Sequence, residues 1–214
     1  MTATLIQTPS SGVLLKNISW HTYESLVNEL AEQPGIRLTY DRGNLEIMTP
    51  SAPHEGSKKI LGRFVESVTE ELNVEIRSLG SLTCRREGLA RGLEPDQCYY
   101  IQNENVVWDK EQIDLNQDPP PDLVVEIDVT SSSIDRLSLY ASLGVPEVWR
   151  YDGNRLIIYQ LEADEYAERD VSPTFPFLSQ VEMLRFLELR RTTKENALIR
   201  LFREWVKNQI QQGE

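Results

Sequence analysis

The chain has 214 residues, of which 40% are hydrophobic and 26% are charged, the composition of an ordinary globular protein. Its formal net charge of −12 argues against nonspecific binding to nucleic acid, because surfaces that dock on phosphates are usually basic. The sequence has no signal-like N-terminal run and no apolar span of about 18 residues, so neither secretion nor membrane insertion is predicted. We therefore expect a cytoplasmic protein in which Cys84 and Cys98 stay reduced.

The N-terminal part of the chain predicts an arm, a helix and a hairpin. Residues 1–17 are rich in Thr and Ser without a sustained period, so we expect a flexible arm followed by one domain over residues 18–214. Ser19 is a predicted N-cap for a helix over residues 20–31. Alternating apolar residues on both sides of Asp41-Arg42-Gly43-Asn44 predict a β-hairpin over residues 36–48.

The rest of the chain alternates between strand-like and helix-like patterns. Apolar positions at a period of 3.6 predict a long helix that ends near Leu72, after a lead-in over residues 51–54. The remaining predicted elements are strands over 74–79 and 82–85, a basic turn over 86–91, a strand opened by Pro95-Asp96, a loop with a turn of helix over 103–117, a hairpin around Asp152-Gly153-Asn154, a crossing segment over 171–177, and helices over 179–189 and 194–211.

Residues 119–151 form the segment around which the other elements are predicted to assemble. Its apolar run from Leu123 to Val129 is typical of a strand buried on both faces. The run Thr130-Ser131-Ser132-Ser133 supplies hydroxyls where a helix begins, and Gly144 ends that helix before a strand over residues 147–151.

Two carboxylates interrupt the apolar strand. Alternation places Glu126 and Asp128 on the same face, at a spacing of roughly 6.6 Å per two residues, so they are able to converge on one ion. Buried carboxylates need a cation, a proton or a metal to compensate their loss of hydration. Asp122 lies on the order of 13 Å from Glu126 and is expected to mark the solvent end of the strand.

Four features in this order resemble a known family: PDLVVEI, a Ser-rich loop, DR-x-x-x-Y and GVPEVWRYD. Over residues 18–190 the chain resembles the putative restriction endonuclease family common in cyanobacteria, within the PD-(D/E)xK nuclease superfamily. The resemblance implies an α/β restriction-endonuclease-like fold, with a mixed central sheet flanked by helices, an N-terminal helix-hairpin extension and C-terminal helices. It also implies Mg²⁺-dependent hydrolysis of DNA, with Mn²⁺ as an alternative ion.

By this resemblance Asp96 and Glu126 are the two acids of the motif, and with Asp128 they form the predicted metal ligands. Asp128 stands where the superfamily has a lysine. In the resembling family that lysine commonly lies on the following helix, four residues before the tyrosine, where this chain has Arg136. A guanidinium orients a phosphate but does not accept a proton from water, so Asp128 is expected to supply part of that role. Glu55 is a further candidate carboxylate.

Each candidate also has a purely structural interpretation. Glu126 and Arg136 would form the same ion pair without catalysis, and His54 is expected to be a surface residue at a helix start. Tyr140 and Trp149 are predicted to lie in the core. The C-terminal cations are expected to be a solvated helical face, namely Arg185, Arg190, Arg191, Lys194, Arg200, Arg203 and Lys207.

The sequence therefore leaves two functional hypotheses. The first is a Mg²⁺-dependent DNA endonuclease that uses Asp96, Glu126 and Arg136. The second is a catalytically inactive member of the same fold that serves as a binding or interaction module, which Asp128, Arg136 and the acidic charge favour. A homodimer is expected by analogy, because cutting two strands commonly uses two active sites.

Overall fold

The computed structural model describes residues 4–7, 12–31, 33, 35–49, 52–80, 82–128 and 132–213. Ser51 of the expected helix lead-in, Val129 of the expected strand and Thr130-Ser131 of the expected hydroxyl run lie outside the described residues. None of the described helices is both long and apolar enough to span a membrane.

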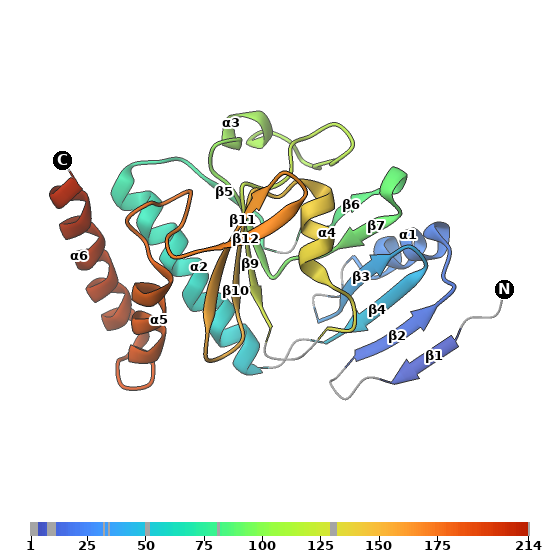
Figure 1. The fold of residues 1–214 in the computed structure, drawn as a ribbon, viewed down its shortest axis with the longest axis horizontal. Helices are drawn as coiled ribbons and strands as arrows, with labels where there is room; N and C mark the ends of the chain where they lie inside the picture. The colour runs from blue at the N-terminus through green and yellow to red at the C-terminus, as the bar shows by residue number, and fades with distance from the viewer. Residues whose placement is uncertain are drawn as a thin grey trace.

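A mixed six-stranded sheet forms the centre of the molecule (Figure 1). Its strand order is β12-β11-β10-β9-β8-β5, and β9 and β10 are parallel whereas all other neighbours are antiparallel. The strands are β5 (Arg77–Ser78), β8 (Gln97–Tyr100), β9 (Leu123–Ile127), β10 (Glu147–Tyr151), β11 (Leu156–Glu162) and β12 (Glu165–Arg169). This is the mixed central sheet that the family resemblance predicts.

A second six-stranded sheet lies beside the first and is antiparallel throughout, in the order β1-β2-β4-β3-β7-β6. We call it the N-terminal sheet. Its strands are β1 (Thr4–Gln7), β2 (Gly12–Lys16), β3 (Arg37–Asp41), β4 (Asn44–Met48), β6 (Cys84–Arg86) and β7 (Arg91–Leu93). Arg42 and Gly43 both have positive φ, which makes the two-residue turn of the predicted hairpin.

Helices cover both faces of the central sheet (Figure 1). Leu123 and Val125 of β9 pack in a core with α2, α5 and α6, whereas Val124 faces a second core with α4. This alternation explains why β9 is buried along its whole length. The helices are α1 (Trp20–Glu29), α2 (Ala52–Leu72), α3 (Glu104–Val107), α4 (Arg136–Leu143), α5 (Gln180–Leu189) and α6 (Glu195–Gly213), with a short 3-10 turn over Glu87–Leu89.

Several local expectations are confirmed. Ser19 accepts a hydrogen bond from the backbone N–H of Thr22 at 3.1 Å and caps α1. Gly144 ends α4 with a φ of 82°, a conformation that glycine adopts without strain. Tyr140 and Trp149 are fully buried, and Cys84 and Cys98 are buried free thiols.

Other expectations need correction. The predicted flexible arm contains β1 and β2, and β2 pairs with β4, because Leu14 and Leu15 pack against two different cores. The predicted basic turn over residues 86–91 leads directly into β7, and β12 was not predicted at all. The N-cap of α4 is Asp135, which accepts a hydrogen bond from Ser138 N at 3.3 Å, rather than a residue of the hydroxyl run.

Candidate functional site

Asp96 and Glu126 lie side by side at the ends of neighbouring strands. Gln97 of β8 is paired with Val125 of β9, so Asp96 stands beside the next residue of β9, Glu126. The backbone N–H of Ile127 donates to Asp96 Oδ2 at 2.8 Å. Both carboxylates are buried, with residue exposures of 5% and 7%. The structure thus places the two predicted acids next to each other.

Asp96 also binds a residue from the first turn of α2. His54 Nε2 lies 2.9 Å from the same Asp96 Oδ2, and His54 is 7% exposed. The expectation that His54 is a surface residue is wrong, because its ring is buried and contacts the buried carboxylate of Asp96. Among the described residues, Asp96 Oδ1 accepts no hydrogen bond from a protein group.

Glu126 is held by Arg136 of α4 through a two-pronged ion pair. Arg136 Nη2 lies 2.7 Å from Glu126 Oε1, and Arg136 Nε lies 3.1 Å from Oε2. The hydroxyl of Tyr140, one helical turn later, also donates to Glu126 Oε1. Both carboxylate oxygens of Glu126 are therefore occupied by protein donors.

The remaining donors of Arg136 reach the N-terminal sheet and its connection to β8. Nη1 donates to Thr39 Oγ1 of β3 at 2.7 Å, and Nη2 donates to the carbonyl oxygen of Glu94 at 2.8 Å. The Arg136 side chain is only 15% exposed. This guanidinium thus joins both sheets and has little capacity left to contact a ligand.

The buried charges alter each other's proton affinity. Burial raises the pKa of Asp96, but the hydrogen bond from His54 and the charges of His54 and Arg136 outweigh it, so this pKa lies below its ordinary value. Burial raises the pKa of Glu126, the charge of Arg136 opposes that rise, and the charge of Asp96 adds to it, with a net increase. Burial lowers the pKa of Arg136, but Glu126, Tyr140 and Asp96 together raise it by more, so the guanidinium stays charged.

Asp128 and Glu55 are held elsewhere. Arg150 of β10 donates to Asp128 Oδ2 from Nε at 3.0 Å and also from Nη2, so Asp128 is paired with its own arginine. The side chain of Glu55 is 51% exposed and lies 3.4 Å from His54 Nδ1 and 3.7 Å from Lys58 Nζ. The structure does not bring either carboxylate to Glu126.

Sequence reasoning missed Glu46, a buried carboxylate on β4 with 1% exposure. Its Oε1 accepts a hydrogen bond from Ser133 N at 2.7 Å, and its Oε2 accepts one from Ser132 Oγ at 2.5 Å. It lies opposite Thr39 in the β3–β4 ladder and therefore next to the residue that binds Arg136. An acidic residue inside the apolar run LEIM was the available signal.

Asp122 is also buried, at 3% exposure, and does not mark a solvated strand end. Its carboxylate accepts hydrogen bonds from Ile101 N at 2.7 Å and from Asn103 N at 2.9 Å. It thereby satisfies backbone groups of the loop that follows β8, which is a structural role.

These residues do not form a preformed metal centre. Carboxylate oxygens suit a hard divalent ion, and Asp96 Oδ1 is unoccupied by protein donors in the described structure. However, Glu126 and Asp128 each face a guanidinium, and no three His, Cys, Asp or Glu side chains among the described residues gather as a metal site. At Glu126, the positive charge that a metal ion would bring is already supplied by Arg136.

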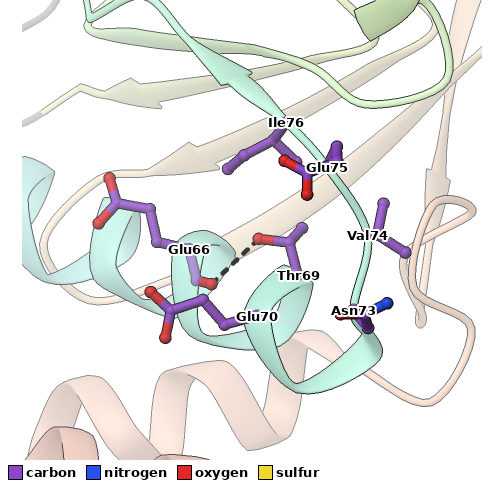
Figure 2. Close-up of a pocket in the computed structure, with 7 residues that line it drawn as sticks. All are labelled: Glu66, Thr69, Glu70, Asn73, Val74, Glu75 and Ile76. Carbon is purple, nitrogen blue, oxygen red and sulfur yellow. Dashed lines mark hydrogen bonds between the residues drawn. The ribbon is translucent and has the colours of Figure 1, made fainter.

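The pocket at the far end of α2 is unrelated to this cluster (Figure 2). Its lining includes Glu66, Glu70 and Glu75, and burial together with the charge of Glu70 raises the pKa of Glu66. Glu66 lies twelve residues after His54 in α2, or roughly 18 Å along the helix axis. An acidic hollow repels phosphate, so this pocket is not suited to nucleic acid.

Three comparisons place the chain among known proteins. None of the curated proteins matches it. Among solved structures, it is similar to a putative nuclease belonging to DUF820 from Anabaena variabilis ATCC 29413, with 17% sequence identity, a TM-score of 0.49, and coverage of 74% of this chain and 97% of that chain. The sequence profile of the Uma2 family, described as "Putative restriction endonuclease", matches residues 20–194, which is most of the chain. The resemblance inferred from the sequence is thereby confirmed, and this protein belongs to the Uma2 family.

Proposed function

We propose that this protein is a nuclease that hydrolyses phosphodiester bonds in DNA. The observation that carries the proposal is the buried cluster of Asp96, Glu126 and Arg136, which brings two acids and one cation together at the ends of β8 and β9. Membership of the Uma2 family supports a nuclease. The pKa values of Asp96 and Glu126 are shifted in opposite directions, and perturbed pKa values in one cluster are typical of functional sites.

The chain's own residues have distinct tasks in this proposal. Arg136 stays positively charged and fixes Glu126, while Tyr140, whose pKa is raised well above its ordinary value chiefly by burial, keeps its proton and donates it to the same carboxylate. His54 orients Asp96 and leaves Asp96 Oδ1 for a ligand. The family relationship implies a divalent ion, Mg²⁺ or Mn²⁺, but because the residues do not form a metal centre as arranged, we assign it no step.

A second candidate function is a catalytically inactive binding module of the same fold. The observation that favours it is that each expected metal ligand is bound by a basic side chain of the protein: Asp96 by His54, Glu126 by Arg136 and Asp128 by Arg150. A guanidinium in place of the family's lysine cannot act as a base. Carboxylates that are neutralised by side chains of the protein can have a structural role without taking part in a reaction.

A cleavage assay separates the two candidates. Supercoiled plasmid DNA is incubated with the purified chain and Mg²⁺ or Mn²⁺, alongside the near-isosteric variants Glu126→Gln and Asp96→Asn. Glu147→Gln is the matched control, because Glu147 is an equally buried carboxylate that binds Trp149 and Thr174. We expect nicking by the wild type and by Glu147→Gln, and none by the other two variants. Absence of cleavage by the wild type, or cleavage that survives Glu126→Gln in a folded protein, contradicts the nuclease.

A titration of Mg²⁺ and Mn²⁺ followed by calorimetry tests the ion separately. Binding that disappears in Asp96→Asn would place the ion at this cluster. Together with an inactive wild type, absence of binding would favour the binding module.

A further inference from the structure

A protein of net charge −12 that acts on DNA needs a local basic surface. Most arginines of the C-terminal helices are neutralised, because Arg185 pairs with Glu182 and Arg203 pairs with Glu70 and Glu71. Other cations of this region have no carboxylate within 4 Å among the described residues. They include Lys59 of α2 and Arg190, Arg191 and Lys194 of the turn between α5 and α6, all of them exposed. We call these four residues the turn patch.

Packing of α2 against the α5–α6 turn brings the turn patch together. Arg190 Nη1 donates to Ser57 Oγ at 3.1 Å, and a side chain at Gly56 would stand only 3.7 Å from Arg190 Nη2. About two turns further along α2, Arg63 binds Glu195 at 2.7 Å. Lys59 lies between Gly56 and Arg63 on that face of the helix, because residues three and four apart are neighbours.

The turn patch also lies next to the Asp96–Glu126 cluster. Ser57, which binds Arg190, follows His54, which binds Asp96, by three residues in α2, so both lie on the same side of the helix. The charges of Arg190 and Arg191 also act on Tyr151, whose pKa is raised by burial and pulled back by these two arginines. Tyr151 ends β10, and its carbonyl oxygen accepts a hydrogen bond from Asp128 N at 2.8 Å. The patch therefore flanks the ends of the strands that carry the cluster.

We propose that the turn patch docks the phosphate backbone of duplex DNA and delivers it to the cluster at Asp96 and Glu126. The choice of DNA rests on the proposed function, but the basic surface itself does not. Exposed arginines present paired N–H groups that match phosphate oxygens, and a lysine adds a mobile point charge. Glu188 of α5 opposes the two arginines at Tyr151, and Glu195, next to Lys194, pairs with Arg63. The four cations of the patch have no carboxylate within 4 Å in the described part of the chain.

The distribution of charge along α2 gives the docking a direction. Lys59 and the α5–α6 turn lie near the N-terminal end of the helix, whereas Glu66, Glu70 and Glu75 surround the pocket at its other end. A polyanion is attracted at the first end and repelled at the second. The backbone of a bound duplex is thus kept near the end of α2 where His54 binds Asp96.

The test measures binding of a labelled duplex by fluorescence anisotropy in EDTA, so that cleavage does not contribute. The double variant Arg190→Ala/Arg191→Ala is compared with Arg185→Ala/Arg203→Ala, which removes the same charge from arginines that already have carboxylate partners. The variant Lys59→Ala/Lys194→Ala repeats the test without touching the Arg190–Ser57 hydrogen bond. Thermal melts verify that every variant is folded.

We expect the patch variants to weaken binding on the order of tenfold or more at about 0.1 M salt, and to reduce the slope of log K against log salt by about two. The control variant should keep both values near those of the wild type. Absence of duplex binding by the wild type, equal losses in patch and control variants, or binding confined to RNA overturns the proposal. Binding that depends on the turn patch, without any cleavage, would contradict the proposed nuclease activity and support the docking role of the patch. Cleavage by a patch variant at the wild-type rate and affinity would support the nuclease activity and contradict the docking role.

Discussion

Replacing Arg136 with alanine should destabilise the protein strongly. The change removes both hydrogen bonds to Glu126 and the bonds to Thr39 and the Glu94 carbonyl, and it leaves a buried carboxylate without its cation. Breaking a buried ion pair by deleting one partner costs about 3–5 kcal/mol. With a urea m value of about 3 kcal/mol/M, the midpoint should fall by roughly 1 to 1.7 M.

Arg150→Ala is the matched control for this measurement. Arg150 pairs with Asp128, the residue directly after β9. The side chain of Arg150 is 42% exposed, whereas that of Arg136 is 15% exposed. A solvent-screened pair contributes only about 0.2–1 kcal/mol. Urea unfolding followed by tryptophan fluorescence reports both variants, because Trp149 is fully buried in the core.

The double variant Glu126→Gln/Arg136→Met tests whether the uncompensated charge is the cause. Removing both charges while keeping an acceptor for Tyr140 should recover much of the lost stability, because buried ion pairs are replaceable by neutral groups of similar size. The reasoning is refuted if Arg136→Ala and Arg150→Ala lower the midpoint equally. It also fails if the double variant is less stable than Arg136→Ala alone.

Three further predictions follow from single buried groups. Glu46→Ala should lower the free energy of unfolding in urea by about 1–3 kcal/mol, because it leaves two donors of the segment before α4 without an acceptor. A loss smaller than that of Arg150→Ala would contradict this. Asp122→Ala should cost about as much, since it leaves two partly buried backbone N–H groups of the loop after β8 without their acceptor, whereas Asp122→Asn should recover part of the loss. Burial lowers the pKa of His54, but Asp96 raises it to a net value above 6.5, so the protonated ring stabilises the fold fully below pH 6.5 and loses that contribution as pH rises through the folded pKa. The stability difference between wild type and His54→Gln should therefore shrink as the pH rises above about 6.5, and a difference that grows with pH would contradict this assignment.

The order of elements in the central sheet was predictable because each signal is local. The apolar run of β9, the glycine after α4 and the turn Asp152-Gly153-Asn154 determine structure within a few residues of themselves. The N-terminal sheet was missed in part because its pairing is long-range. β3 pairs with β7 across about fifty residues, and nothing in the short segment RGL marks it as a strand until Thr39 and Leu93 are known to be partners.

The acids of the candidate site were predictable from the sequence, but most of the side chains that bind them were not. Position in the motif identified Asp96, Glu126 and Arg136, and the ion pair of the last two was foreseen as the structural alternative. Whether Asp128 would share an ion with Glu126 depended on Arg150 of the neighbouring parallel strand, which sequence spacing does not reveal. His54 and Glu46 are buried against partners that are distant in the sequence, Asp96 for His54 and Ser132 and Ser133 for Glu46, which is a tertiary property.

The N-terminal sheet is part of the candidate site rather than an extension of the fold. Thr39 binds Arg136, and Glu46 binds Ser132 and Ser133, so β3 and β4 hold the segment that leads into α4 at both ends. Arg136 in turn fixes Glu126 on β9. A displacement of the N-terminal sheet would therefore remove the hydrogen bond from Arg136 to Thr39 and the support of the segment before α4. That coupling makes the position of Arg136, and with it the charge at Glu126, depend on the packing of the two sheets.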